Sequence, residues 1–120
     1  NPASMAAAIL TLAGKTHATR KIAVLGEMRE LGPAAAALHL ELADKLVAAG
    51  IDRVHTAGEL MRPVMALLPE PVRGHWAVEA SELADQIIAE CQPGDVIMAK
   101  GSNASRVSAF VTKLQEQADA

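Results

Sequence analysis

The chain has 120 residues, of which 51% are hydrophobic, yet it contains only one Phe, one Trp and no Tyr. A chain of this length forms one hydrophobic core rather than two domains of comparable size. Because its apolar side chains are mostly aliphatic, the composition favours closely packed helices and strands over an all-β fold built on aromatic pairs. The formal charge of −3 supplies no basic surface for a nucleic acid.

Cysteine usage and hydropathy narrow the class of protein further. Cys91 is the only cysteine, which excludes an intramolecular disulfide and a cysteine-based zinc site and indicates a reducing compartment, most simply the cytoplasm. No apolar run approaches the roughly 18 residues of a membrane span. The chain opens on Asn1-Pro2 rather than on methionine, so we expect a domain of a longer protein.

Helical and strand patterns alternate along the whole chain. In chain order, we predict a helix over residues 5–13, a strand over 22–25, a helix over 33–49, a strand over 52–57, a helix over 59–68, a strand over 75–78, a helix over 82–92, a strand over 96–99 and a last helix with its apolar stripe over 107–114. Ser4 and Ser81 are the expected N-caps of the first and fourth helices, and the polar tail 115–120 is expected to fray. This alternation predicts an α/β domain with a mostly parallel sheet.

Ligands of open α/β sheets bind beyond the carboxyl ends of the strands, so the loops after the predicted strands are the candidate positions. The loop after the first strand is bounded by Gly26 and Gly32 and carries three charged side chains, Glu27, Arg29 and Glu30. Two carboxylates in a loop are more often solvated than catalytic, so this loop alone indicates no reaction.

The loop after the last predicted strand joins a buried strand to the start of a helix. Unpaired N–H groups and the helix dipole favour an anion there, and Lys100 and Arg106 add positive charge. The loop is not a P-loop, because its lysine precedes the only glycine, Gly101. Ser102 and Asn103 are also ordinary helix-capping residues. Anion binding and simple capping are therefore equal alternatives for this loop.

The remaining reactive side chains suggest no further site. A histidine at a helical position, such as His39, is most often structural, and His17, His55 and His75 lack the spacing of metal ligands. Cys91 has no evident activating base, which favours a buried or inert thiol. We therefore predict no metal site and assign no catalytic residue within this chain.

Four segments occur in an order that is characteristic of a known family: residues 1–5, residues 24–32 followed by His39, residues 49–54 and residues 94–102. Together they resemble the C-terminal domain of the Mur ligase family, specifically the member that adds D-alanyl-D-alanine to UDP-N-acetylmuramoyl-tripeptide in bacterial peptidoglycan synthesis. The resemblance spans nearly all of residues 1–120. It implies a Rossmann-like, three-layer α/β fold with helices on both faces of the sheet.

The resemblance also implies roles for particular residues in an ATP-dependent reaction through an acyl phosphate. The substrate-binding group, facing either D-alanyl-D-alanine or a phosphate, would be Lys100, Gly101, Ser102, Asn103 and Arg106. Asn1 would face the nucleotide. The loop that lines the cleft would contribute Gly26, Glu27, Arg29 and Glu30. ATP and magnesium would be bound mainly by a central domain that this chain lacks.

By the same resemblance, the full protein would act as a monomer in the bacterial cytoplasm, on UDP-N-acetylmuramoyl-tripeptide and D-alanyl-D-alanine. Its product would serve cell-wall growth, cell shape and cell division. The chain alone would be inactive, because it contains no P-loop. The alternative from another functional class is a non-catalytic α/β module that binds a nucleotide or another anion.

Overall fold

The computed structural model describes residues 1–119. Its helices are α1 Pro2–Ala13, α2 Ala35–Ala48, α3 Arg62–Leu67, α4 Ala84–Glu90 and α5 Val107–Asp119. Its strands are β1 Arg20–Gly26, β2 Arg53–Ala57, β3 Arg73–Ala77 and β4 Asp95–Lys100. Short 3-10 turns precede four of the helices: η1 Gly32–Ala34, η2 Glu59–Met61, η3 Ala80–Leu83 and η4 Asn103–Ser105. Within this described part, no helix has the length and apolar character needed to cross a membrane.

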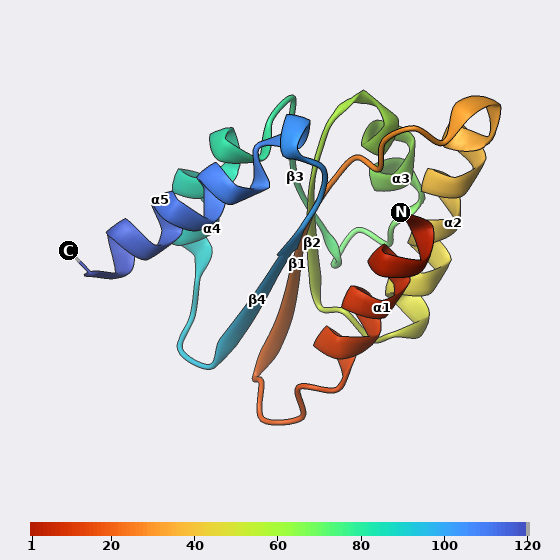
Figure 1. Ribbon diagram of the computed structural model, residues 1–120. Helices are drawn as coiled ribbons and strands as arrows, with labels where there is room; N and C mark the ends of the chain where they lie inside the picture. Colours follow the sequence, from red (N-terminus) through yellow and green to blue (C-terminus); the bar gives the residue numbers. More distant parts are fainter. Residues whose placement is uncertain (120) are drawn as a thin grey trace.

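The four strands form one sheet in the order β3-β2-β1-β4, and all of the neighbouring pairs are parallel. Helices α1, α2 and α3 lie on one side of the sheet, and α4 and α5 lie on the other (Figure 1). This arrangement confirms the predicted three-layer α/β fold. Residues 22–25 of the central strand β1 form an uninterrupted apolar run because both faces of the strand are covered by helices there.

The two faces of the sheet pack two separate hydrophobic clusters. The cluster under α1, α2 and α3 contains Met5, Ile9 and Leu12 of α1, together with Ala23 and Leu25 of β1. The cluster under α4 and α5 contains fully buried side chains from the other face of the strands and from both helices, including Val24, Ala57, Leu83, Ile87 and Phe110. Alternation along β1 thus directs successive side chains into opposite layers.

The strand order creates a topological switch point between β1 and β4. The chain proceeds from β1 to β2 to β3 on one side and then returns to place β4 on the other side of β1. The loops that leave β1 and β4 therefore diverge toward opposite faces, and a crevice forms between them. The two positions singled out in the sequence, the loops after Leu25 and Ala99, follow these two strands.

The ladder between β1 and β4 is closed at its opposite end by an ion pair. Arg20 is in register with Asp95, and Leu25 is in register with Lys100. The guanidinium of Arg20 donates from Nε to Asp95 Oδ1 at 2.9 Å and from Nη2 to Asp95 Oδ2 at 2.7 Å. This two-pronged contact with the Arg20 guanidinium holds the pKa of the Asp95 carboxyl below its usual value.

The structure corrects three local predictions. The N-cap of α1 is Asn1, not Ser4: Asn1 Oδ1 accepts from the Ser4 N–H at 2.7 Å, and Pro2 opens the helix, where a missing N–H costs nothing. The turn before α4 is capped by Glu79 in a capping box with Glu82, not by Ser81. Residues 115–119 continue α5 rather than fray; Ala120 lies outside the described residues.

Candidate functional site

A cavity of about 190 Å³ opens at the switch point, beyond the carboxyl ends of β1 and β4. Its lining residues come from the start of α1 and from the loops after the two strands: Asn1, Met5, Glu27, Met28, Arg29, Lys100, Gly101 and Ser102. Two cationic side chains, Arg29 and Lys100, thus line a small, partly open cavity together with one carboxylate, Glu27. The excess of positive charge suits an anionic group.

Two glycines allow the ends of β1 and β4 to approach closely at this cavity. A Cβ on Gly101 would lie 2.8 Å from the Cα of Gly26, and a Cβ on Gly26 would overlap the side chain of Ser105. Ser105 is buried, and its Oγ donates to the carbonyl of Ser102 at 2.6 Å. Any side chain at either glycine would push the two loops apart, so both glycines are required for the shape of the site.

The two loops are also joined by hydrogen bonds through a single peptide group. The Ser102 N–H donates to the carbonyl of Glu27 at 3.2 Å. The N–H of the same peptide group, that of Met28, donates to Nε2 of the buried His39 at 2.9 Å. From its helical position, His39 was expected to be structural, with no particular partner. Its position eleven residues after Met28 gave no sign of this bond.

Besides lining the cavity, the Glu27 side chain makes a structural hydrogen bond. Its Oε1 accepts from the Leu60 N–H at 3.0 Å, at the turn that precedes α3. Its side chain lies against Gly58, where a Cβ would overlap it, so the space exists only because this residue is glycine. The φ of 105° at Gly58 also favours glycine. Glu27 therefore ties the loop after β1 to the loop after β2, and one of its oxygens is already used in this structural bond.

Part of the predicted substrate-binding group does not line the cavity. Lys100, Gly101 and Ser102 do, whereas Asn103 and Arg106 are exposed and lie outside its lining. Arg106 ends the turn η4 in the left-handed region, with a φ of 64°. Arg106 thus stands between the turn η4 and the first residue of α5, Val107.

The residues of the predicted cleft loop also divide into some that line the cavity and some that do not. Glu27 and Arg29 line the cavity, whereas Gly26 lies at the end of β1 beneath it and Glu30 is exposed at a φ of 59°. Asn1 reaches the cavity, although its side-chain oxygen is engaged in capping α1. The N-terminus of α1 consequently lies at this edge of the sheet (Figure 1).

A second, shallower cavity adjoins the first on the β2 side. It has a volume of about 170 Å³ and shares Glu27, Arg29 and Ser102 with its neighbour; the rest of its lining is Gly58, Glu59, Val78, Ala104 and Ser105. The three shared residues therefore lie at the boundary of both spaces. A ligand too large for the first cavity could extend past them into the second.

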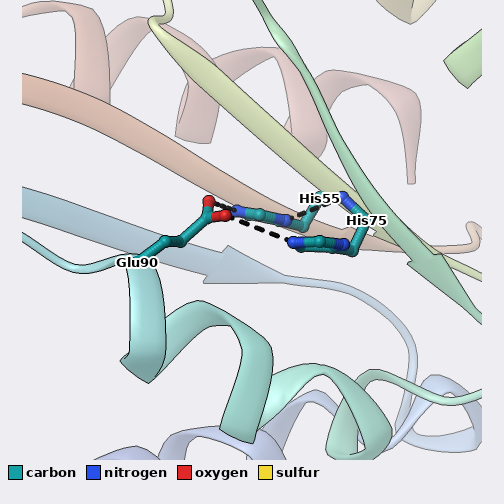
Figure 2. Close-up of side chains that lie close together, drawn as sticks. All are labelled: His55, His75 and Glu90. Carbon is teal, nitrogen blue, oxygen red and sulfur yellow. Dashed lines mark hydrogen bonds and ion pairs between the residues drawn. The ribbon is translucent and has the colours of Figure 1, made fainter.

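Away from this edge, the structure assembles a polar cluster that the sequence did not reveal. His55 of β2 and His75 of β3 stack with their ring centroids 5.3 Å apart, and both face Glu90 at the end of α4 (Figure 2). The Glu90 oxygens lie 3.2 Å from Nε2 of each histidine. Arg53 completes the cluster, donating to both Glu90 oxygens at 3.1 and 3.3 Å.

Burial sets the charge state of this cluster. It lowers the pKa of His55 to about 4, because lost hydration disfavours the imidazolium more than Glu90 stabilises it. Burial acts to raise the pKa of Glu90, but the hydrogen bond from Arg53 and the neighbouring positive charge outweigh it, and the pKa of Glu90 falls below its usual value. At neutral pH, a neutral His55 thus lies beside an ionised Glu90.

Three potential ligand atoms within 4.8 Å of one another raise the question of a metal ion. The backbone N–H of His75 donates to Nδ1 of His55 at 2.9 Å, so the proton of neutral His55 resides on Nε2. Nε2 is the atom that would have to bind the metal. The two rings are also nearly parallel, with an interplanar angle of 10°, so their lone pairs run side by side rather than converge. The cluster fits a partly buried structural contact better than a metal centre.

Cys91 differs in part from its prediction. Its side chain is exposed rather than buried, but desolvation by neighbouring groups, followed by the charge of Asp95, raises the pKa of the thiol. A raised pKa leaves little of the reactive thiolate at neutral pH. The geometry therefore supports an unreactive thiol, although not a buried one.

Comparisons with known proteins place this architecture in a family. Two relatives are named UDP-N-acetylmuramoyl-tripeptide–D-alanyl-D-alanine ligase. The one from Rickettsia prowazekii is 30% identical over 115 residues, and the one from Escherichia coli is 32% identical over 118 residues. The alignments cover 96% and 97% of this chain but 25% of each relative. The chain thus spans about a quarter of the length of these relatives.

Solved structures share the fold at low sequence identity. A MurF ligase from Thermotoga maritima in complex with ADP superposes with a TM-score of 0.77 at 23% identity, covering 99% of this chain and 26% of that one. MurF from Acinetobacter baumannii gives a TM-score of 0.79 at 22% identity, covering 97% and 25%. A family model described as the glutamate ligase domain of Mur ligases matches residues 1–103. The chain therefore belongs to the Mur ligase family.

Proposed function

We propose that residues 1–120 are the C-terminal domain of an ATP-dependent ligase that adds D-alanyl-D-alanine to UDP-N-acetylmuramoyl-tripeptide. The two relatives named for this reaction, and the extent of the alignment with them, support the proposal. The structural observation that carries it is the cavity at the switch point, whose lining includes both Lys100 and Arg29. A small cationic cavity is what a domain needs if it holds the anionic end of a substrate.

The size of the cavity limits what it can hold. At about 190 Å³ it is smaller than the pockets of roughly 300–1,000 Å³ that enclose a whole small molecule. It therefore accommodates one end of a ligand and leaves the other end facing outward. A dipeptide bound by its carboxylate would present its amine to a second domain, which is the geometry that ligation requires.

In this proposal, the domain contributes binding and orientation rather than a nucleophile or a base. ATP supplies the phosphoryl group that activates the tripeptide carboxylate. Lys100 and Arg29 hold the incoming dipeptide so that its amine is aligned for attack, a gain in effective concentration. In the alternative placement, Lys100 faces a phosphate and stabilises charge that develops in the transition state.

The donor set of the cavity argues that magnesium binds elsewhere. Mg²⁺ prefers about six oxygen ligands, whereas this cavity offers one carboxylate, Glu27, next to two cationic side chains. One Glu27 oxygen already accepts from the Leu60 N–H. We therefore propose that ATP and magnesium bind mainly to a central domain, and that the 120-residue chain alone does not turn over ATP.

The proposed cellular setting follows from the proposed reaction. A ligase that extends a nucleotide-linked peptidoglycan precursor would act in the bacterial cytoplasm and contribute to cell shape and cell division. We propose that it acts as a monomer, without nucleic-acid or membrane partners. The formal charge of −3 gives no support to binding a polyanion.

A coupled assay of the full-length protein tests the function. With ATP and UDP-N-acetylmuramoyl-tripeptide, phosphate release should require D-alanyl-D-alanine, and mass spectrometry should show the pentapeptide product. Turnover that instead requires glutamate or meso-diaminopimelate, with the corresponding shorter precursor, would show a different family reaction. The 120-residue chain, assayed in parallel, should release no phosphate from ATP; sustained release would overturn the proposed division between domains.

A further inference from the structure

We infer that His39 is a positioning residue of the ligand site: it sets the conformation of both loops that line the cavity without lining the cavity itself. The inference rests on the proposed function for its kinetic consequences, but not for its structural ones. It starts from the position of His39 on α2, where its side chain is fully buried. A buried imidazole must satisfy both ring nitrogens within the protein.

The hydrogen bonds of His39 fix its tautomer. The Met28 N–H can only donate, so Nε2 of His39 accepts, at 2.9 Å. The ring proton then lies on Nδ1, which donates to the carbonyl of Ala35 at 2.7 Å, one turn earlier in α2. Both nitrogens are used, and the bond to Ala35 fixes the ring orientation that points Nε2 at the loop after β1.

The target of His39 is the peptide group that connects the two loops. Its N–H, from Met28, goes to His39, and its carbonyl, from Glu27, accepts from the Ser102 N–H at 3.2 Å. Donation to His39 polarises this peptide group and strengthens its carbonyl as an acceptor. A single chain of hydrogen bonds therefore runs from α2 through the loop after β1 to the loop after β4.

Loss of His39 Nε2 would affect the site more than its surroundings. The N–H of Met28 would remain buried without its partner, since Met28 is 4% exposed, and the peptide group would be free to rotate. The backbone segments that carry Glu27, Arg29 and Ser102 would then no longer be held in one relative position. A histidine that served only to fill the core would act through packing volume, so an apolar residue of similar size would replace it without affecting the site.

Three variants of the full-length ligase separate these possibilities. His39→Leu removes the acceptor, whereas His39→Gln places an amide oxygen near the position of Nε2. Leu42→Ala, one turn further along α2, deletes a buried side chain that does not bond to the loop. We expect His39→Leu to raise the KM for D-alanyl-D-alanine at least tenfold with a KM for ATP within twofold of wild type, and His39→Gln to restore much of the loss. Leu42→Ala should lower the melting temperature while leaving both KM values near wild type.

Amide hydrogen exchange on the 120-residue chain supplies a readout that does not depend on ligase activity. The amides of Met28 and Ser102 should exchange at least tenfold faster in His39→Leu than in wild type, whereas amides in the β1–β2 ladder should not. Unchanged exchange at both amides, or equal kinetic effects of His39→Leu and Leu42→Ala, would overturn the inference. Absence of dipeptide ligation by the wild-type protein would instead refute the proposed function and leave the exchange result valid.

Discussion

Gly26 and Ser105 are packed so closely that a β-carbon on Gly26 would occupy the space of the Ser105 side chain. We predict that Gly26→Ala lowers the free energy of unfolding by about 2–3 kcal/mol, because overpacking forces β1 and the start of α5 apart. Urea denaturation of the 120-residue chain measures the change. The double variant Gly26→Ala/Ser105→Gly should recover part of the loss.

Gly14 provides the matched control for this prediction. It ends α1 at a φ of −75°, and a β-carbon there would meet nothing closer than 3.5 Å. Gly14→Ala should therefore be neutral or stabilising by up to about 1 kcal/mol. Equal stability of the Gly14→Ala and Gly26→Ala variants would show that the close approach at Gly26 is not restrictive.

Lys100 and Arg106 carry the same charge and belong to the same predicted substrate-binding group, but they differ in their relation to the cavity. Lys100 lines it and Arg106 does not. In the full-length ligase, Lys100→Ala should reduce kcat/KM by about 10²-fold, as is typical when a charged group that contacts the reacting molecules is removed. Arg106→Ala should change kcat/KM less than threefold, because Arg106 lies outside the cavity lining.

The kinetic pattern of Lys100→Ala also distinguishes its two proposed roles. A loss expressed in the KM for D-alanyl-D-alanine would indicate that Lys100 binds the dipeptide carboxylate. A loss expressed in kcat would indicate contact with a phosphate or with the developing oxyanion. Wild-type values for both parameters would remove Lys100 from the site.

The pair between Arg20 and Asp95 is predicted to contribute substantially to stability. The Asp95 side chain is 3% exposed and also accepts from the Gln92 N–H at 2.8 Å. Asp95→Ala should therefore lower the free energy of unfolding by about 2–3 kcal/mol, because buried charge-assisted bonds are lost. The exposed pair of Glu59 and Arg62, 3.8 Å apart, serves as the control: Glu59→Ala should cost less than about 0.5 kcal/mol.

The buried His55 predicts a loss of stability in acid. Its pKa is about 4 in the folded chain and 6.5 in its ordinary range, so the unfolded chain binds more protons between these values. The free energy of unfolding should accordingly fall as the pH is lowered from 6.5 toward 4, by roughly 3 kcal/mol at most. The lowered pKa of Glu90 adds to the loss as the pH falls further, because its ionised form is the one bound in the folded state.

Chemical denaturation between pH 7 and pH 4 measures this slope. His55→Asn should flatten it, whereas His17→Asn, at an exposed histidine, should leave it unchanged. A slope that is the same in wild type and His55→Asn would place the acid sensitivity elsewhere.

Saturating zinc should not raise the melting temperature, since the parallel rings of His55 and His75 do not converge on a metal.

The fold was predictable from sequence because its strongest signals are periodic. Covered parallel strands appear as continuous apolar runs, and the two such runs, residues 22–25 and 96–99, fall within β1 and β4. The strands β2 and β3 contain polar residues and were placed by the alternation of helix and strand patterns. The loops after Leu25 and Ala99 could be selected for the same reason, since the ends of parallel strands lie at one edge. The start of α1 was missed although Asn1-Pro2 is a standard helix opening.

The finer geometry of the site was not predictable, because it depends on contacts between residues far apart in the chain. Arg106 lies outside the cavity lining and has a left-handed backbone conformation just before α5, which no sequence pattern indicated. The bond from Met28 to His39 depends on how α2 packs against β1. His55 and His75 meet because β2 and β3 are adjacent, with an irregular register between Val54 and Thr56 that no local pattern encodes.

The bond between Arg20 and Asp95 has a consequence for the opposite end of the same ladder. A parallel strand displaced by one residue presents every side chain to the wrong layer. β4 is an edge strand, bonded only to β1, so its alignment is less constrained than that of a central strand. The ion pair between the first residues of the two strands fixes their register, and this register places Lys100 opposite Leu25. The position of Lys100 in the cavity lining is thus determined in part at the far end of the sheet.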